Sequence, residues 1–295
     1  MSKNVTKDAL AHFVDGVISC FGETYLRRPN EHDLARLLYV GEQRGFPGMI
    51  GSIDCMHWEW KNCPTAWAGQ FTGRSGIATI ILEAVASYDL WIWHAFFGTP
   101  GSCNDINVLH RSPVFNDVLE GRSPEVSYIV NGRENNRAYY LTDGIYPSWA
   151  AFVKSIISPQ NRKHKLFAQH QESARKDVER AFGVLQARFA FIRRPCLVWD
   201  RDFMGKIMMA CIIMHNMIVE DERDTYQNYY DPTEFLTDTP TTTQGEDVGS
   251  FNYSTQRISN LSTYMTNRDQ LRNREAHHAL QNDLIEHIWA KFGSP

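Results

Sequence analysis

The stretch Gly45-Phe-Pro-Gly-Met-Ile-Gly-Ser-Ile-Asp-Cys55 decides the fold. Its first glycines predict a turn, and the apolar residues that follow predict a short strand around Met49–Cys55. Asp54 interrupts this apolar run, and an ionised carboxylate is costly to bury there unless a positive group meets it. We therefore expect this strand to carry a functional residue as well as part of the hydrophobic core.

Helices and further strands are expected on either side of this strand. Before it, residues 5–45 have apolar positions at helical spacing. After it, the apolar runs Ile77–Ser87 and Leu90–Phe97 are separated by Tyr88-Asp89 and predict a hairpin. The other expected elements are a helix opened by a capping box of Ser102 and Asp105, extended segments at 126–130 and 138–141, a short helix from Pro147 to Ile156, and helices at 172–189, 203–219 and 269–291.

This order of elements predicts an α/β fold, in which a mixed sheet is flanked by helices and extended by helical segments at both termini. A dinucleotide-binding fold is excluded because no GxGxxG follows the first strand. The predicted organisation is a helical N-terminal segment (1–46), an α/β domain (47–222), an acidic and polar linker expected to be disordered (223–265) and a C-terminal amphipathic helix (266–295).

The formal net charge of -4 conceals an uneven distribution. From Lys154 to Arg201 there are 11 Lys and Arg residues against 4 Asp and Glu, whereas from Glu220 to Ser250 there is 1 against 9. A basic cluster binds phosphate only if its members share a face, so charge alone leaves a nucleic-acid partner and a solvated surface equally open.

Cysteine spacing and hydropathy exclude several other classes of protein. The six cysteines show no CxxC spacing, which argues against a zinc ribbon or a disulfide framework and indicates a reducing compartment. The N-terminus has no secretory signal pattern, and no run of about 18 apolar residues predicts a membrane span.

Three acids stand where such a sheet would bring strand ends and a helix together. Asp54 lies on the first strand, Asp143 lies just past a later strand, and Glu179 lies in the helix at 172–189. Mg²⁺ and Mn²⁺ prefer oxygen ligands and take few protein carboxylates, so the pattern suits a pair of these ions. The residues alone leave an ordinary explanation open, for example a helix salt bridge between Glu179 and Arg175.

Five motifs follow one another along the chain: Gly45 to Pro64, Gly101-Ser-Cys-Asn-Asp-Ile-Asn-Val-Leu109, Tyr140-Leu-Thr-Asp-Gly-Ile-Tyr-Pro147, Asp177-Val-Glu-Arg-Ala-Phe-Gly-Val-Leu-Gln-Ala-Arg-Phe189 and Cys211-Ile-Ile-Met-His-Asn-Met-Ile218. Together they resemble the motifs of PIF/Harbinger-type transposases and their domesticated nuclease relatives. The resemblance extends from about residue 8 to the C-terminal helix. It is specific because several long motifs occur in the family's order.

The resemblance implies an RNase H-like core with an Asp, Asp, Glu triad. Position by position, the triad falls on Asp54, Asp143 and Glu179, with 35 residues between the last two. It implies a DNA endonuclease in which these three residues bind a divalent metal cation, Mg²⁺ or Mn²⁺, with two such ions in the site. It further implies that the protein is nuclear and has no membrane partner. A separate Myb/SANT-like partner protein would then supply DNA binding. Full-length members have more helical sequence upstream, so we expect target recognition to depend on more than this chain.

Other polar and aromatic residues allow two interpretations. Asp105 is either an auxiliary acid or, as we favour, a residue that caps a helix and compensates its dipole. Candidates for DNA-phosphate contacts surround Glu179, with plain solvation as the alternative: Arg175, Lys176, Arg180 and Arg188. Packing or hydrogen bonding, rather than a metal contact, is expected for His57, His110 and His215, and core packing rather than base stacking is expected for Trp58, Trp60 and Trp67.

Two functions therefore stand side by side. The leading hypothesis is a transposase-derived, metal-dependent endonuclease that hydrolyses phosphodiester bonds with a triad on two metal ions. The alternative is a domesticated, catalytically silent protein that keeps the fold and interacts with DNA or chromatin. Divalent-ion binding distinguishes the two.

Overall fold

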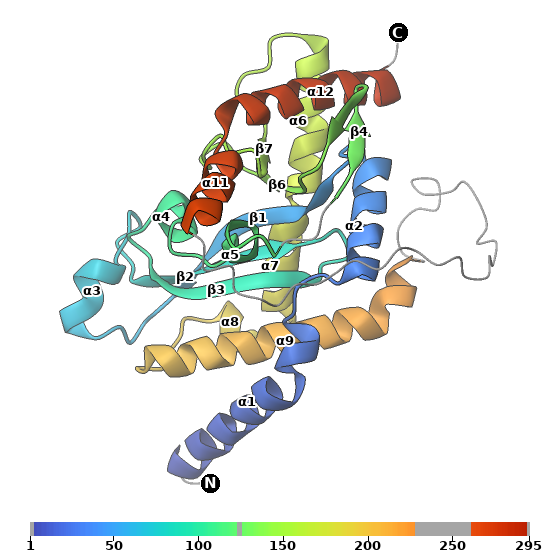
Figure 1. Ribbon diagram of the computed structural model, residues 1–295. Coiled ribbons are helices and arrows are strands. Elements are labelled where there is room, and N and C mark those ends of the chain that lie inside the picture. Colours follow the sequence, from blue (N-terminus) through green and yellow to red (C-terminus); the bar gives the residue numbers. More distant parts are fainter. Residues whose placement is uncertain (1–2, 123–125, 228–260, 294–295) are drawn as a thin grey trace.

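A five-stranded mixed sheet forms the centre of the protein (Figure 1), in the strand order β3-β2-β1-β6-β7. The computed structural model describes residues 3–122, 126–227 and 261–293. β1 pairs antiparallel with β2 and parallel with β6. The strands are β1 (Met49–Glu59), β2 (Thr79–Ala86), β3 (Ile92–Pro100), β6 (Tyr139–Thr142) and β7 (Phe152–Lys154), and β4 (Tyr128–Val130) and β5 (Arg133–Asn135) form a separate hairpin. The expected RNase H-like α/β fold is confirmed.

Helices cover both faces of the sheet because side chains alternate between the faces along each strand. Ser52 and Met56 of β1 contact α7, whereas Cys55, on the other face, contacts Asp105 at the start of α4. In Figure 1, α9 runs beside β3 and α1, while α12 crosses α6 near the β7 end of the sheet. The longer helices are α1 (Lys3–Tyr25), α2 (Glu31–Gln43), α6 (Arg162–Arg175), α7 (Asp177–Arg188), α9 (Arg201–Gln227), α11 (Leu261–Leu271) and α12 (Arg274–Phe292).

The shorter helices lie in the connections between these elements. They are α3 (Thr65–Phe71), α4 (Asp105–Leu109), α5 (Asn116–Leu119) and α8 (Ala190–Arg193).

The central strands are buried on both faces, as the apolar sequence of β2 requires. Ile80, Leu82 and Ala84 face one side, and all three are 0% exposed. The largest hydrophobic cluster joins these strands to α7 and α9, and a second cluster places α6 and α12 against β6 and β7. The two clusters meet at β1, so the strand that carries Asp54 lies between two cores.

α9 is held to the edge of β3 by one buried asparagine. The Asn216 side chain accepts a hydrogen bond from the Ile92 N–H at 2.9 Å and donates to the Ile92 carbonyl at 2.8 Å. The next residue toward the N-terminus, His215, contacts the Leu90 carbonyl through Nε2 at 2.8 Å, and burial lowers its pKa to about 4. A helix thus takes the place of a further strand at this edge.

Several expected elements differ from those observed. The helix predicted from Pro147 to Ile156 was wrong, because Phe152–Lys154 instead forms β7 beside β6. The helix predicted at 172–189 is two helices that meet at Lys176, and the one predicted at 269–291 is α11 followed by α12. Most of the linker predicted at 223–265 lies outside the described residues.

Two composition-based expectations can be compared with the structure. All six cysteines are free thiols. By length and composition alone, the stretch Arg201–Arg223 of α9 could cross a membrane, and 56% of its most apolar window is buried within the protein. A helix that packs on β3 and α1 in this way is apolar because it belongs to the core.

Candidate active site

Register places two of the predicted acids together. In the parallel pair of β1 and β6, Ser52 lies opposite Leu141. Asp54 follows Ser52 by two positions within β1, and Asp143 follows Leu141 by two positions and lies near enough to raise the pKa of Asp54 by charge repulsion. Asp143 comes directly after β6, and its carboxylate accepts a hydrogen bond from the Ile145 N–H at 3.0 Å.

Asp54 is a largely desolvated acid, with its side chain 19% exposed. Burial raises the pKa of its carboxyl to about 6, although the Cys55 N–H and the Arg175 guanidinium lower it. Asp143 and Asp105 raise this pKa further by charge repulsion. Burial and, to a smaller extent, the neighbouring acids therefore disfavour the charged carboxylate, which a cation beside it would stabilise.

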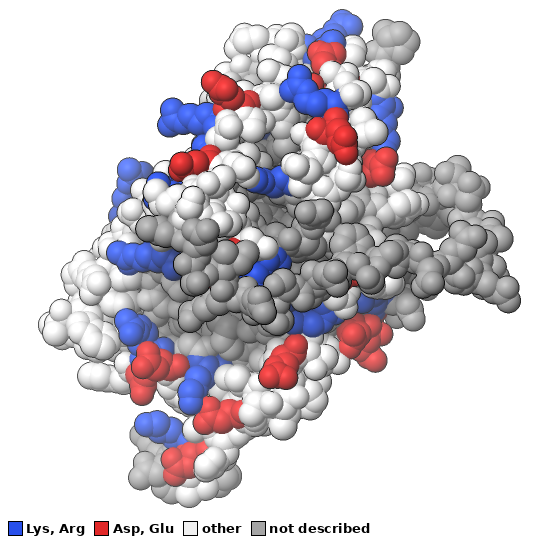
Figure 2. Space-filling model, viewed as in Figure 1, with Lys and Arg blue, Asp and Glu red and all other residues white. Residues whose placement is uncertain are grey.

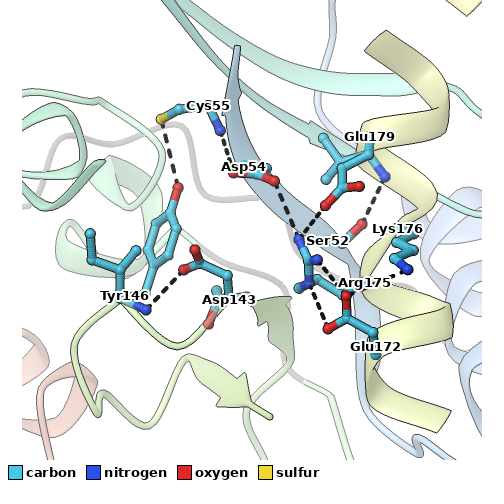
Figure 3. Close-up of polar contacts among 12 residues, drawn as sticks. Ser52, Asp54, Cys55, Asp143, Tyr146, Glu172, Arg175, Lys176 and Glu179 are labelled. Atoms are coloured by element: carbon cyan, nitrogen blue, oxygen red, sulfur yellow. Dashed lines mark hydrogen bonds and ion pairs between the residues drawn. The ribbon is translucent and has the colours of Figure 1, made fainter. Parts of the chain in front are cut away.

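Glu179 is brought to the sheet by α7. The Val178 N–H donates to Ser52 Oγ at 3.1 Å, a buried bond between the helix residue next to Glu179 and the strand residue two before Asp54. Figure 3 shows Glu179 and Asp54 extending toward each other from α7 and β1. This hydrogen bond, together with the buried side chain of Val178, holds the start of α7 against β1.

Arg175 lies between these two acids. Its Nη1 is 2.5 Å from Glu179 Oε1 and 3.4 Å from Asp54 Oδ2, so one guanidinium nitrogen serves both carboxylates. The helix salt bridge between Glu179 and Arg175 that the spacing allowed is thus confirmed. In Figure 3, Asp54 lies between Asp143 on one side and Arg175 with Glu179 on the other.

Asp105 approaches the site from the other face of the sheet. Burial raises the pKa of its carboxyl, Cys55 lowers it through a hydrogen bond, and Asp143 raises it again. The predicted capping box was wrong, because Asn104 is the N-cap of α4 and its side chain accepts from the Asn107 N–H. Asp105 does lie in the first turn of α4, where a negative charge compensates the helix dipole, and its carboxylate also interacts with Cys55 and Asp143.

The carboxylate oxygens of the site are ligands of the type that a hard cation requires, and the carboxylates stand apart from one another. Carboxylate oxygens are the ligands that Mg²⁺ and Mn²⁺ prefer. Within the described parts of the chain, no three Asp, Glu, His or Cys side chains are already grouped tightly enough to hold one ion. A guanidinium nitrogen between Asp54 and Glu179 nevertheless demonstrates that the space between them accepts a positive charge.

The four basic residues near Glu179 have different environments. Arg175 is buried among carboxylates, and Arg188 is held inside by His215 and Glu222. Lys176 and Arg180 have side chains 52% and 44% exposed, and each also lies near an acid of its own helix region. Lys176 and Arg180 are therefore the two of the set whose side chains are largely exposed, and each is paired with an acid, Glu172 and Asp177 respectively.

Surface charge does not form one continuous basic region on the face shown in Figure 2. Lys and Arg side chains of the described residues alternate there with Asp and Glu. Part of the excess of basic residues between Lys154 and Arg201 forms ion pairs within the protein, as Arg175 does with Glu179 and Arg188 with Glu222.

The expected packing of histidines and tryptophans is met in most cases. His215, Trp58 and Trp60 are buried, and the indole N–H groups of the two tryptophans donate to the Arg194 and Val198 carbonyls. Trp67 is 44% exposed and packs on Trp60 and Phe71. His57 and His110 are exposed, the first within hydrogen-bond distance of Thr79 and the second against Trp149.

Sequence reasoning missed three residues of the site. Glu172 forms two hydrogen bonds with Arg175, Ser52 joins β1 to α7, and Glu83 is fully buried beside Cys55 with neither carboxylate oxygen hydrogen-bonded. The spacing of Glu172, Arg175 and Glu179 on a helix was a signal that could have identified the first. Glu83 gave a signal too, as the one acid in the apolar run from Ile77 to Ser87.

Comparisons with known proteins agree with this arrangement. The family model described as "Plant transposon protein" matches residues 23–226, more than two thirds of the chain and all three predicted triad positions. "Protein ALP1-like" of Arabidopsis thaliana is 25% identical over 61% of this chain and 45% of its own length. The mouse protein named "Putative nuclease HARBI1" is 24% identical over 72% of this chain and 57% of its own, and the human protein of that name is 20% identical over 62% and 50%.

The chain spans about half the length of the curated relatives it matches. No solved structure matches it. Two observations lead to one conclusion. The central strand of a five-stranded mixed sheet is surrounded by Asp54, Asp143 and Glu179, and the family model covers all three residues. The chain belongs to the plant transposon protein family, a family of PIF/Harbinger transposase-derived nucleases.

Proposed function

We propose that this protein is a divalent-metal-dependent DNA endonuclease in which Asp54, Asp143 and Glu179 hold two Mg²⁺ or Mn²⁺ ions. The observation that carries the proposal is the approach of these carboxylates from two neighbouring parallel strands and a packed helix, with a positive group already between two of them. Bound there, the ions would activate the attacking water or DNA 3′-hydroxyl and stabilise the leaving oxygen of a phosphodiester.

The chain's own residues would orient the substrate and hold charge. Asp54 and Asp143 present oxygens from the rigid sheet, whereas Glu179 presents its oxygens from α7. Lys176 and Arg180, at the half-exposed end of α7, would position DNA phosphates without reading sequence. A nuclear location and a Myb/SANT-like partner that selects the DNA are part of the same proposal.

Nicking of supercoiled plasmid by the purified protein tests the proposal. We expect Mg²⁺- or Mn²⁺-dependent conversion to the nicked form, abolished by chelation. Asp54→Asn, Asp143→Asn and Glu179→Gln keep side-chain volume and should each lower the rate by about 10³-fold or more, the range of lost electrostatic stabilisation. The exposed control Asp15→Asn, which loses only a surface pair with Lys206, should cleave like the wild type. Nicking that survives all three triad substitutions would refute the assignment.

The second candidate is a catalytically silent protein that interacts with DNA or chromatin. The observation that favours it is the open arrangement of the acids, with Arg175 already serving as counter-ion for Asp54 and Glu179. Isothermal calorimetry separates the candidates. Heat of binding at millimolar Mg²⁺ or Mn²⁺ supports the endonuclease. If neither the wild type nor variants that remove Arg175 show any heat of binding, the silent protein is supported.

A further inference from the structure

Arg175 has three acidic partners, from two helices and the sheet. It is the last residue of α6, and Glu172 lies one turn before it in the same helix. Glu179 follows in α7, and Asp54 belongs to β1. Figure 3 shows the guanidinium at the centre of the three carboxylates.

The two sides of the guanidinium serve different partners. Nε and Nη2 face Glu172, at 3.4 and 2.8 Å from its two oxygens. Nη1 faces Glu179 at 2.5 Å and Asp54 at 3.4 Å. A guanidinium can keep a two-bond pair with one carboxylate while its remaining nitrogen changes partners, because its donors form a rigid fork.

Burial makes this choice of partners energetically important. Arg175 is 9% exposed, whereas the side chains of Glu172 and Glu179 are both 43% exposed. Charges in such a partly desolvated place interact more strongly than on the surface. Arg175 therefore cannot be left without a partner, and Glu172 supplies one that does not belong to the triad.

Negative charge exceeds positive charge around this arginine. The acids of the cluster are Asp54, Asp105, Asp143, Glu172 and Glu179, and the cations that interact with them are Arg175, Lys176 and, near Asp143, Lys154. A monovalent guanidinium thus only partly neutralises the position between Asp54 and Glu179. A divalent ion at that position would neutralise it better and would repel the guanidinium.

We propose that Arg175 is a positioning residue that occupies a cation position of the triad and yields it to a divalent metal ion, while Glu172 retains the guanidinium by its other side. This inference rests on the proposed function, since it assigns Asp54 and Glu179 to metal binding. Nη1 breaks its contacts with Asp54 and Glu179 on metal entry, and the contacts of Nε and Nη2 with Glu172 persist. Removal of Arg175 and removal of Glu172 then have opposite effects on metal affinity.

Metal titration of the purified full chain by calorimetry, with Mn²⁺ as the probe, tests this pair of effects. Arg175→Gln removes the competing charge and should lower the Kd for Mn²⁺ by about 3- to 10-fold, a coupling of about 1 kcal/mol. Arg175→Lys keeps the charge and should stay near the wild-type Kd. Glu172→Gln removes the alternative partner, leaves the guanidinium on the triad acids, and should raise the Kd by a similar factor.

A matched control removes an arginine–carboxylate pair elsewhere. Arg133→Gln breaks the pair with Asp283 at 3.3 Å, near α12, and should leave the Kd unchanged. A thermal melt without metal confirms that each variant is folded before titration. If Arg175→Gln unfolds, comparison of Arg175→Lys with Glu172→Gln still tests the proposal, because only Glu172→Gln should weaken Mn²⁺ binding.

The outcomes separate this inference from the proposed function. Mn²⁺ binding that tightens in Arg175→Gln and weakens in Glu172→Gln supports both. Binding by the wild type that is equal or weaker in Arg175→Gln overturns the role of Arg175 and leaves the endonuclease proposal standing. No binding by the wild type or by any variant overturns the metal site itself, and the inference with it.

Discussion

Asp54 and Asp143 lie at matching positions beyond the paired residues Ser52 and Leu141 of two neighbouring parallel strands. This relationship brings Asp143, just past the end of β6, near Asp54 in the middle of β1, where the charge of Asp143 adds to burial in raising the pKa of the Asp54 carboxyl. A protein selected for stability alone would have no reason to keep such a pair. The arrangement has a cost in folding free energy that can be measured.

Replacement of Asp54 by Asn should stabilise the metal-free protein at neutral pH. The pKa of Asp54 is about 6 in the folded protein, above its usual value of 3.8. Between about pH 4 and pH 6 the folded state therefore holds a proton that the unfolded state has lost, so stability falls as pH rises through this window. Above it the deficit is constant, and Asp54→Asn should recover about 1–3 kcal/mol.

Urea unfolding of wild type and Asp54→Asn at pH 4 and pH 7, with a chelator present, measures this difference. The advantage of Asn should nearly vanish at pH 4, where the wild-type carboxyl is already protonated. Asp15→Asn, on the surface, should show no comparable gain. An equal advantage at both pH values would contradict the assigned cause.

Lys176 and Arg180 should contribute to DNA affinity without setting its sequence preference. Each phosphate contact that is lost lowers the dependence of log K on log salt by about 1. Fluorescence anisotropy with a labelled duplex, between 50 and 200 mM salt, should thus show a smaller slope for Lys176→Gln and Arg180→Gln. Lys163→Gln, which loses an exposed pair with Glu286, is the control. Slopes equal to that of the wild type would remove both residues from the interface.

Arg188 should behave differently from these two, although it was predicted as a phosphate contact in the same way. Its guanidinium contacts the ring and carbonyl of His215 and pairs with Glu222. Arg188→Gln should therefore lower the free energy of unfolding by about 1–3 kcal/mol, as expected for unpaired buried polar groups. Chemical denaturation measures the loss, and an unchanged midpoint would show that the arginine is dispensable for the fold.

Asn216 should be among the most sensitive polar positions of the core. Asn216→Ala leaves the N–H and carbonyl of Ile92 without their side-chain partner and should cost about 2–4 kcal/mol. The control Asn135→Ala removes an amide that donates only to the Arg133 carbonyl two residues away, and should stay within about 1 kcal/mol. Urea midpoints that do not differ between the two variants would contradict the role of Asn216.

Much of the sheet followed from local sequence. The hairpin at 77–97 was predictable because two apolar runs of strand length flank a short polar turn. β7 was not, because Phe152–Lys154 is too short to show a period of its own and extends only through pairing with β6. The break at Lys176 was equally hidden, since the apolar stripe continues from one helix into the next.

The candidate site followed from sequence less fully than the fold. The three acids could be chosen because family motifs place Asp54 in an apolar strand, Asp143 after a strand and Glu179 in a helix, although β1 continues beyond Asp54 to Glu59. Their environment could not be predicted, because it depends on contacts between residues far apart in the chain. The bond from Val178 to Ser52 and the contact of Arg175 with Asp54 span more than a hundred residues each, and no local pattern records them.

The Ser52 hydroxyl has a consequence for the choice between ions. It joins β1 to α7 beside Asp54 and Glu179, so in the proposed metal site it would help to set how far apart their oxygens stand. Mg²⁺ requires short bonds in a nearly regular octahedron, whereas Ca²⁺ accepts longer and irregular ones. Discrimination of magnesium from calcium would then depend on an uncharged side chain that touches neither ion, and its loss would first appear as tolerance of the larger ion.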